Sequence, residues 1–421
     1  MTIKQSLIDP AIIVHHALRV SWPLRRLRAA APKPSVPQTP TRFAVIPGDA
    51  SDPSGSLGDM AMFTALMQGL RTRTPAATFT IVGTRDHHIT VPGIGEVPVV
   101  AAWDGTAGAI AFDKLIRQHH ALFVMGADIL DGKYGAALVQ RIVAYCNHSV
   151  QLGIPATTLG FSFNRQPRRP AVHALARLHP KVTVNVRDQP SLARFSRIVG
   201  IPATLCADSA FLMPPAADAE PEAEAWIAAM RAAGRTPVGV NLNAHALAPA
   251  IEHAGTDALV AHLAGQLAQA GEQLGLAYML IPHDLKLQSA DASMLQWLAS
   301  QLQQRGFPHL RYTPLERPDT IKRLTGLLDF VITGRMHLAI ASLGSATPTL
   351  SIAYQDKFEG LYQHVGLSPE HILSPLQCLG DELLTRIHHA CAQRHDNRAR
   401  IRARLPQVIA LATRNLDLAD C

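Results

Sequence analysis

Short apolar segments alternate with longer segments of helical periodicity along most of the chain. The short segments end at glycine, proline or polar residues, which is typical of buried strands. The longer segments, such as 135–152 and 191–199, repeat apolar residues every three or four positions and predict helices. This alternation favours a mostly parallel, doubly wound α/β sheet. The predicted strands cover residues 43–47, 78–82, 97–101, 121–125, 156–160, 182–186, 203–206, 237–242, 277–281, 309–312, 329–333 and 349–353.

One break divides this pattern into two blocks. The segment Met213–Pro221 is small, acidic and rich in proline, as linkers often are. We therefore expect two Rossmann-like domains facing a cleft, the glycosyltransferase-B-like architecture, with a C-terminal helix that could cross back to the first domain. The expected divisions are an N-terminal domain at 43–213, a linker at 214–236, a C-terminal domain at 237–375 and basic helices at 376–421.

Residues 1–42 stand apart from the two blocks. Apolar residues recur there at near-helical spacing beside several arginines, and four prolines then predict an extended linker. His15 and His16 interrupt the apolar region, which argues against a secretory signal. Residues 1–30 could contact a membrane peripherally or bind a partner. The alternatives are packing on the main body and disorder.

Composition narrows the class of protein. The 421 residues are 48% hydrophobic and 17% charged, which describes a globular chain. Five scattered cysteines without a CxxC pair favour a reducing, cytoplasmic location, with the inner face of the membrane as a further candidate. The formal charge is +7, but aromatic residues make up only 5%, so a nucleic-acid partner is not expected. Anionic small molecules or acidic lipid headgroups explain the charge as well.

The most informative motif is Gly334-Arg335-Met336-His337, which follows a predicted buried strand and opens a predicted helix. Lys357 follows the next strand. Consecutive strand ends of a parallel sheet share one edge, where helix N-termini also favour anions. A guanidinium, an imidazole and an ammonium group would converge there on a doubly anionic small molecule. The alternative is that Arg335 only pairs with Asp329 or Asp356.

Other strand ends carry weaker candidates. In Gly55-Ser56-Leu57-Gly58-Asp59, glycines could let the backbone approach a ligand, or could form an ordinary flexible loop. In Gly126-Ala127-Asp128, Asp128 could accept hydrogen bonds from a sugar; with Asp131 it could hold a cation, or Asp131 could simply cap a helix.

Two further strand ends carry cationic or titratable side chains. Arg187 could hold a carboxylate, or could form a surface pair with Asp188 while Asp188 caps the next helix. Asp208, after the following strand, is expected to be structural. His283 could face the same edge as Arg335, although a lone histidine is often only a packed or capping residue.

Taken together, these residues resemble the polysaccharide pyruvyl transferase family over about residues 43–367. The most specific part of the resemblance is Gly334–His337 with Tyr354-Gln355-Asp356-Lys357-Phe358-Glu359-Gly360-Leu361 and Gly366-Leu367. Arg187–Ser191, Gly200-Ile201, Asp208, Gly55–Asp59 and Ile281–Asp284 match further blocks of the family. One departure is Gly126-Ala127-Asp128, where members often have three glycines, and it bears on the acceptor pocket.

The resemblance implies a transferase that moves the pyruvyl group of phosphoenolpyruvate onto a sugar of a cell-surface polysaccharide or its lipid-linked precursor, forming a pyruvate ketal. No metal or cofactor is required by this chemistry. The expected catalytic residues are His337, Arg335 and Lys357. The expected donor-binding residues are Arg187, Arg335, His337, Lys357 and His283, and the expected acceptor-binding residues are Asp59, Asp128, Gly58 and Gly126.

Two other functions remain open from the sequence. A nucleotide-sugar-dependent glycosyltransferase of the same fold would need a site for ribose and diphosphate in the second domain. A non-catalytic subunit of a polysaccharide-assembly complex would not need the arginine, histidine and lysine cluster.

Overall fold

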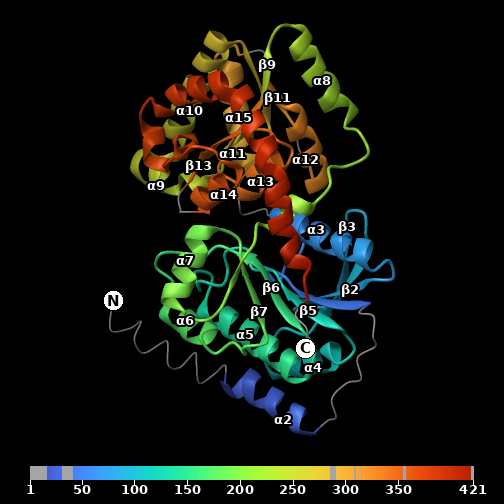
Figure 1. Ribbon diagram of the computed structural model, residues 1–421. Coiled ribbons are helices and arrows are strands. Elements are labelled where there is room, and N and C mark those ends of the chain that lie inside the picture. Colours follow the sequence, from blue (N-terminus) through green and yellow to red (C-terminus); the bar gives the residue numbers. More distant parts are fainter. Residues whose placement is uncertain are drawn as a thin grey trace. The chain divides into compact units, whose positions relative to one another are not determined.

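In a computed structural model, the chain forms two compact α/β units. The structure describes residues 17–30, 41–284, 291–307, 310–313, 315–353 and 357–418. Unit 1 contains the described parts of Met1–Ser54, Met62–Leu212 and Ala410–Cys421, and unit 2 those of Gly55–Ala61 and Met213–Ile409. Each unit has its own sheet with helices around it (Figure 1).

The sheet of unit 1 has the strand order β3-β4-β2-β1-β5-β6-β7-β8. Its pairs are parallel except β3 with β4. The strands are β1 (Arg42–Ile46), β2 (Thr78–Gly83), β3 (His87–Val91), β4 (Gly95–Ala101), β5 (Ala121–Val124), β6 (Ala156–Phe161), β7 (Thr183–Val186) and β8 (Thr204–Leu205). The helices are η1 (Ala17–Ser21), α2 (Trp22–Ala30), α3 (Leu57–Arg73), α4 (Gly105–Ile116), α5 (Ala136–Gln151), α6 (Arg169–Leu175), α7 (Gln189–Ile198) and the 3₁₀ turn η2 (Ser209–Leu212).

The sheet of unit 2 is parallel, with the order β11-β10-β9-β12-β13-β14. The strands are β9 (Thr236–Asn241), β10 (Leu276–Leu280), β11 (Leu310–Tyr312), β12 (Phe330–Thr333), β13 (Thr349–Ile352) and β14 (Ile372–Leu373). The helices are α8 (Pro221–Ala232), α9 (Ala244–Ala254), α10 (Thr256–Leu274), α11 (Asp291–Gln304), α12 (Pro318–Leu327), α13 (Met336–Gly344), α14 (Lys357–Val365) and α15 (Glu382–Thr413), with 3₁₀ turns at Pro369–His371 and Pro375–Leu379. The last turn of α15 and the 3₁₀ turn Arg414–Leu416 belong to unit 1. Helix α8 lies within the segment predicted as a linker.

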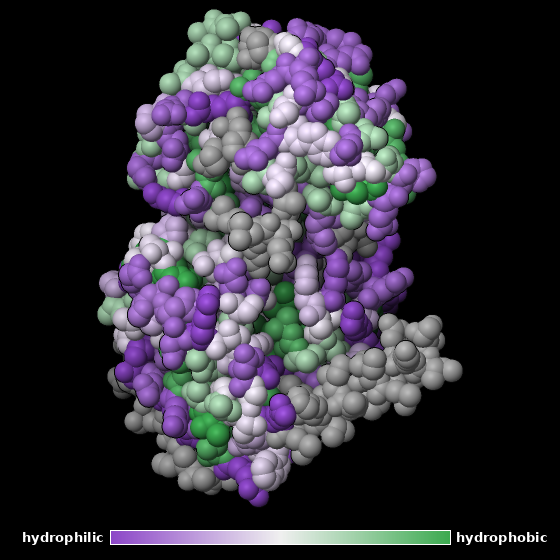
Figure 2. Space-filling model, turned by 180° about the vertical axis from the view of Figure 1, so that it is seen from behind, coloured by the Kyte–Doolittle hydropathy of each residue, from purple (hydrophilic) through white to green (hydrophobic). Residues whose placement is uncertain are grey.

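The predicted α/β fold with two doubly wound sheets is confirmed. Strands β5, β6, β10 and β12 are buried along their whole length, because helices cover both faces of a parallel sheet. That burial explains why they appear in the sequence as continuous apolar segments. Strand β3 was not predicted, since its edge position leaves His88 and Thr90 exposed and its apolar pattern short. On the face drawn in Figure 2, polar residues predominate on each unit, and apolar residues form small separate patches.

The order of strands identifies one special place in each sheet. From β9 the chain adds β10 and β11 on one side, then returns to place β12 on the other side of β9. In unit 1 the same reversal separates β1 from β5. Ligands of doubly wound proteins bind where the strand order reverses, outside the carboxyl ends of the strands. The loops after β12 and β5, which carry Arg335 and Asp128, lie at these two places.

The end of the chain returns to unit 1, as the predicted crossing of the C-terminal helix requires. Asn415 is fully buried there. Its Oδ1 atom accepts a hydrogen bond from the Gly160 backbone N–H (2.7 Å), and its Nδ2 atom donates to the Ala207 carbonyl oxygen (2.8 Å). The side chain thus links the ends of β6 and β8 and fixes the turn Arg414–Leu416 to this sheet.

Candidate functional site

The turn from β12 to α13 positions the predicted arginine and histidine. The Thr333 hydroxyl accepts a hydrogen bond from the Arg335 backbone N–H (2.9 Å), and Arg335 is the N-cap of α13. A Cβ atom on Gly334 would lie 2.6 Å from Asn243 Nδ2 and 2.8 Å from Ala246 Cβ. Glycine is therefore needed at position 334 because the start of α9 packs directly on the turn.

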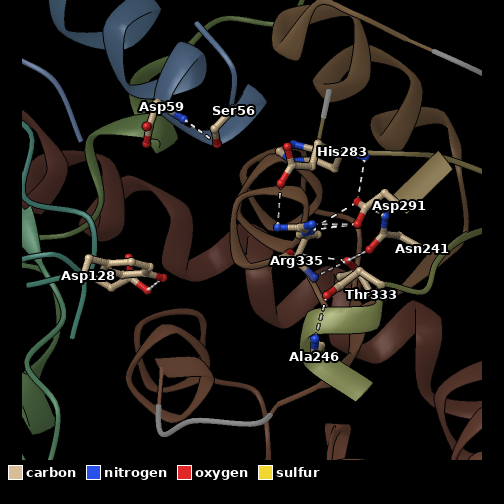
Figure 3. Close-up of polar contacts among 12 residues, drawn as sticks. Ser56, Asp59, Asp128, Asn241, Ala246, His283, Asp291, Thr333 and Arg335 are labelled. Carbon is tan, nitrogen blue, oxygen red and sulfur yellow. Dashed lines mark hydrogen bonds and ion pairs between the residues drawn. The ribbon is translucent and has the colours of Figure 1, made fainter. Parts of the chain in front are cut away.

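Two carboxylates hold the Arg335 guanidinium (Figure 3). Nη2 lies 2.8 Å from Asp291 Oδ1, Nε donates to the same carboxylate, and Nη1 lies 3.0 Å from Asp284 Oδ2. Asp291 is fully buried and also accepts hydrogen bonds from Asn241 Nδ2 (3.0 Å) and the His283 backbone N–H (3.1 Å). A two-pronged grip of this kind fixes the plane of the guanidinium.

The ion pairs of Arg335 differ from the alternative that paired it with Asp329. The expected partner Asp329 instead pairs with Arg231, at 3.0 Å, and Asp356 lies outside the described residues. The sequence placed the arginine opposite a doubly anionic ligand, and in the structure two carboxylates already offset its charge. Sequence reasoning missed Asp291 because nothing local marks it as an arginine partner. In the sequence, Asp291 is marked only as an acidic residue at the start of a helix that follows a strand of the same sheet.

His283 lies in the loop that follows β10, three residues after the strand ends, and is buried. Burial, reinforced by the positive charges of His337 and Arg335, lowers the pKa of His283 to about 3. The imidazole is therefore neutral near pH 7. It can donate or accept a hydrogen bond in a site, but it adds no positive charge there.

The glycine loop before α3 contacts His337. A Cβ atom on Gly58 would lie 2.3 Å from His337 Nδ1, so the ring packs on bare backbone at this position. Ser56 forms an antiparallel bridge with Asp284, and Leu57 is buried in the apolar core that contains Val331. Gly58 thus lies in unit 2, beside the candidate acid/base residue His337. The sequence had predicted only that this glycine contacts the acceptor. Asp59 lies in the first turn of α3, where its N–H donates to the Ser56 hydroxyl (3.5 Å).

Lys357 is the first residue of α14 and is half-buried. Its helix follows β13, which pairs with β12 in parallel, so the loops after both strands leave the same edge of the sheet. This is the arrangement that the motif predicted for Lys357. The neighbouring Tyr354, Gln355 and Asp356 lie outside the described residues.

In unit 1, the loop after β5 carries Asp128. A Cβ atom on Gly126 would lie 2.3 Å from the Leu159 carbonyl oxygen, and Ala127 has a φ of 40°, a conformation that favours glycine. Asp128 is half-buried and accepts a hydrogen bond from the hydroxyl of Tyr134 (3.4 Å), whose side chain is 54% exposed. The expectation that Asp131 caps a helix is wrong. Its carboxylate accepts from the Lys133 N–H (2.8 Å), and the N-cap of α5 is Gly135.

Arg187 is buried within unit 1. Its Nη1 lies 2.8 Å from Asp208 Oδ2, and its Nε donates to the Ser162 hydroxyl (2.8 Å). Asp188 caps α7, as one alternative predicted, by accepting from the Ser191 N–H (2.7 Å), while Arg187 pairs with Asp208. These contacts join the ends of β6, β7 and β8. They give Asp208 the structural role expected of it, and they do not support the donor-binding role expected of Arg187.

Comparisons with solved structures agree with this architecture. The chain is similar to a trehalose-6-phosphate synthase, OtsA, with 10% identity, a TM-score of 0.53 and coverage of 89% of this chain and 97% of that one. It is also similar to Anabaena HepE, solved with UDP and glucose (14% identity, TM-score 0.52, coverage 90% and 96%). A UDP-N-acetylglucosamine 2-epimerase from Listeria monocytogenes gives 10% identity, a TM-score of 0.58 and coverage of 89% and 94%. The fold is thus that of glycosyltransferase-B enzymes and related epimerases.

Sequence comparison identifies the family. A search among curated proteins finds no significant match. The family model for polysaccharide pyruvyl transferases matches residues 57–356, which include Gly58, Asp128, His283, Asp291, Arg335 and His337. Because the match covers most of the chain, the protein belongs to the polysaccharide pyruvyl transferase family.

Proposed function

We propose that the protein transfers the pyruvyl group of phosphoenolpyruvate to two hydroxyls of one sugar in a cell-surface polysaccharide or its lipid-linked precursor, forming a pyruvate ketal. The observation that carries this proposal is the fixed Arg335 guanidinium beside His337, at the reversal of strand order in unit 2. A carboxylate and a phosphate on one small molecule suit an arginine, a lysine and a helix N-terminus at one sheet edge.

The donor binds by exchange with Asp284. Asp291 is fully buried and holds Nε and Nη2 of Arg335, so it stays in place and orients the guanidinium. Asp284 holds Nη1, and an anionic oxygen of the donor replaces it there. Lys357 supplies a further positive charge from the neighbouring loop. Neutral His283 contributes hydrogen bonding alone, and Arg187 is not part of this donor site.

The reaction proceeds by addition and then elimination. A proton adds to the CH₂ carbon of phosphoenolpyruvate and makes it a methyl group, leaving an oxocarbenium-like centre at C2. One sugar hydroxyl forms a C–O bond to C2, the C2–O bond to phosphate breaks, and the second hydroxyl closes the ketal. The two hydroxyls lose two protons in all. One replaces the proton that was added to the CH₂ carbon, and the other leaves with phosphate. His337 acts as the acid/base group, since an imidazole can exchange protons near neutral pH. Arg335 and Lys357 stabilise charge on the departing phosphate.

The acceptor sugar is held by carboxylates and by an aromatic ring. Asp128 accepts hydrogen bonds from sugar hydroxyls, and the exposed Tyr134 beside it offers an apolar ring face to the sugar. The close approach of Gly126 to Leu159 fixes the backbone that carries Asp128. Asp59 and Gly58 contribute from the start of α3, on the His337 side.

The decisive experiment incubates the protein with phosphoenolpyruvate and lipid-linked oligosaccharides. We expect release of inorganic phosphate and a mass gain of one pyruvate less one water on the acceptor. Replacing His337 with alanine should lower turnover by about 10²- to 10⁴-fold. Release of a nucleoside diphosphate from a nucleotide sugar, without use of phosphoenolpyruvate, would assign the chain to glycosyl transfer instead. Unchanged turnover in the His337→Ala variant would refute the role of His337, and no turnover with either donor would favour a non-catalytic subunit.

A further inference from the structure

The N-terminal helical segment Ala17–Ala30 has two different faces. Val20 and Leu24 are 0% and 3% exposed and belong to the apolar core of unit 1, together with Phe112 and Tyr145. Pro23 is also buried, and the Leu27 carbonyl accepts a hydrogen bond from Arg117 of α4. The inner face is therefore an integral part of unit 1, as the packing alternative predicted for these residues.

The outer face carries cations around one aromatic ring. Trp22 is 50% exposed, and Arg19, Arg25 and Arg26 are exposed around it at positions three or four residues away. The Arg26 guanidinium lies over the Trp22 ring, 3.8 Å from its centroid. No acidic residue occurs between Ala17 and Ala30. We name Arg19, Trp22, Arg25 and Arg26 the basic–aromatic face.

We propose that the basic–aromatic face docks unit 1 on a membrane surface rich in anionic lipid headgroups. Three exposed guanidinium groups complement headgroup phosphates, and no carboxylate within the segment neutralises them. A half-exposed tryptophan is the side chain that prefers the boundary between headgroups and acyl chains. Half of the Trp22 surface stays exposed although the Arg26 guanidinium covers one ring face, so part of the ring is available for this contact.

The attachment is peripheral. Among the described helices, none is both long and apolar enough to cross a membrane. The inner face of Ala17–Ala30 is already committed to the core through Val20 and Leu24, so the helix lies flat and inserts only the Trp22 ring. A surface attachment of this kind would bring an enzyme to a lipid-linked acceptor. The proposal does not depend on which donor the enzyme uses.

The test is sedimentation of the full chain with vesicles. We expect binding to vesicles of phosphatidylcholine mixed with phosphatidylglycerol, little binding to phosphatidylcholine alone, and loss of binding as salt is raised. The Arg25→Gln/Arg26→Gln double variant should bind about 25-fold more weakly, from about fivefold per arginine. Trp22→Ala should weaken binding at high salt as well, because its contribution is apolar.

Matched controls make the result specific. Arg402 and Arg404 are exposed on α15, in unit 2, and the Arg402→Gln/Arg404→Gln variant removes the same charge. It should bind anionic vesicles as the unchanged protein does, and thermal unfolding should verify that all variants fold. Equal loss in this control, equal binding to neutral vesicles, or no binding by the unchanged protein would overturn the proposal. Displacement by inorganic phosphate, but not by chloride at equal ionic strength, would also overturn it and indicate a site for free phosphate.

Discussion

Arg187 of unit 1 and Arg335 of unit 2 occupy comparable places in the two sheets, since each follows a buried parallel strand and precedes a helix. Their surroundings differ. Arg187 is 3% exposed and pairs with a carboxylate that is 2% exposed, whereas the Arg335 side chain is 21% exposed and is shared between a fully buried carboxylate and one that is 10% exposed. A wholly enclosed pair has no face left for a ligand, while a partly exposed guanidinium with one replaceable partner does.

The two arginines also show that a charged residue in a family motif does not always have an exposed charged group. Both arginines belong to segments that resemble the family, and both were expected to hold the donor. Only the arginine at the reversal of strand order has an exposed guanidinium edge. Position in the sheet therefore separates the arginine that we propose binds the donor from the one that ties loops together.

The largest expected effect comes from breaking either ion pair. Arg187→Ala and Arg335→Ala should each lower the free energy of unfolding by about 3–5 kcal/mol, because each leaves a buried carboxylate without its partner. Arg335→Ala is thus not a clean probe of catalysis. Urea unfolding measures both losses.

Paired replacements then separate the two arginines. Arg187→Met/Asp208→Leu and Arg335→Met/Asp291→Leu should both recover much of the lost stability, since a buried pair can be replaced by apolar side chains at little cost. We expect turnover of phosphoenolpyruvate to return only in the first. If the second double variant is equally active, Arg335 has no role in the donor site.

The two acidic partners of Arg335 should differ in kinetics. Asp291→Asn loosens the guanidinium and should lower kcat by about 10- to 100-fold, the range for hydrogen bonds to charged groups. Asp284→Asn removes only the group that the donor replaces, so it should lower the KM for phosphoenolpyruvate by up to about tenfold. Steady-state kinetics measure kcat and KM separately and so distinguish the two variants. A higher KM in Asp284→Asn would contradict the exchange.

Gly58 tests the contact with His337. In Gly58→Ala, the added methyl group would press on the imidazole ring and should lower kcat by about tenfold through misplacement of the ring. Gly265→Ala, within α10, is the control, because outside the helix backbone the nearest heavy atom to an added Cβ is Arg305 Nε at 4.0 Å. That variant should stay active and gain up to about 1 kcal/mol in stability. Full activity in Gly58→Ala would separate this loop from the reaction.

The effect expected to be smallest near neutral pH is a pH dependence of stability from His283. Its folded pKa of about 3 lies below the ordinary value of 6.5, so the unfolded chain binds the proton first as the pH falls. Folding stability should therefore decrease below about pH 6.5, by up to about 1.4 kcal/mol per pH unit from this residue, and should not depend on it above that pH. Unfolding of His283→Gln at several pH values should show a shallower slope. An identical slope would mean that the histidine is not buried in its neutral form.

Much of this architecture could be predicted before the structure. Buried parallel strands are continuously apolar, so the positions of β5, β9 and β12 follow from the sequence, as does the turn that carries Gly334, Arg335 and His337. The edge strands β3 and β14 were missed, because partial exposure or short length removes the apolar signal. Because the strands could be located from their apolar residues, the candidate site residues could be placed at the carboxyl ends of those strands.

The partners of those residues were not predictable. Asp291 is separated from Arg335 by 44 positions, and Asp208 from Arg187 by 21, and no local pattern pairs them. Likewise Gly58 packs on His337 although the sequence placed the glycine loop in the other domain.

The sequence by itself determined the α/β class, the strand ends that carry chemistry and the family, because periodicity and motifs are local properties of the chain. Only the tertiary structure decided which charges are compensated, which histidine is neutral and which arginine is enclosed. These properties depend on burial and on ion pairs between segments that lie far apart in the sequence.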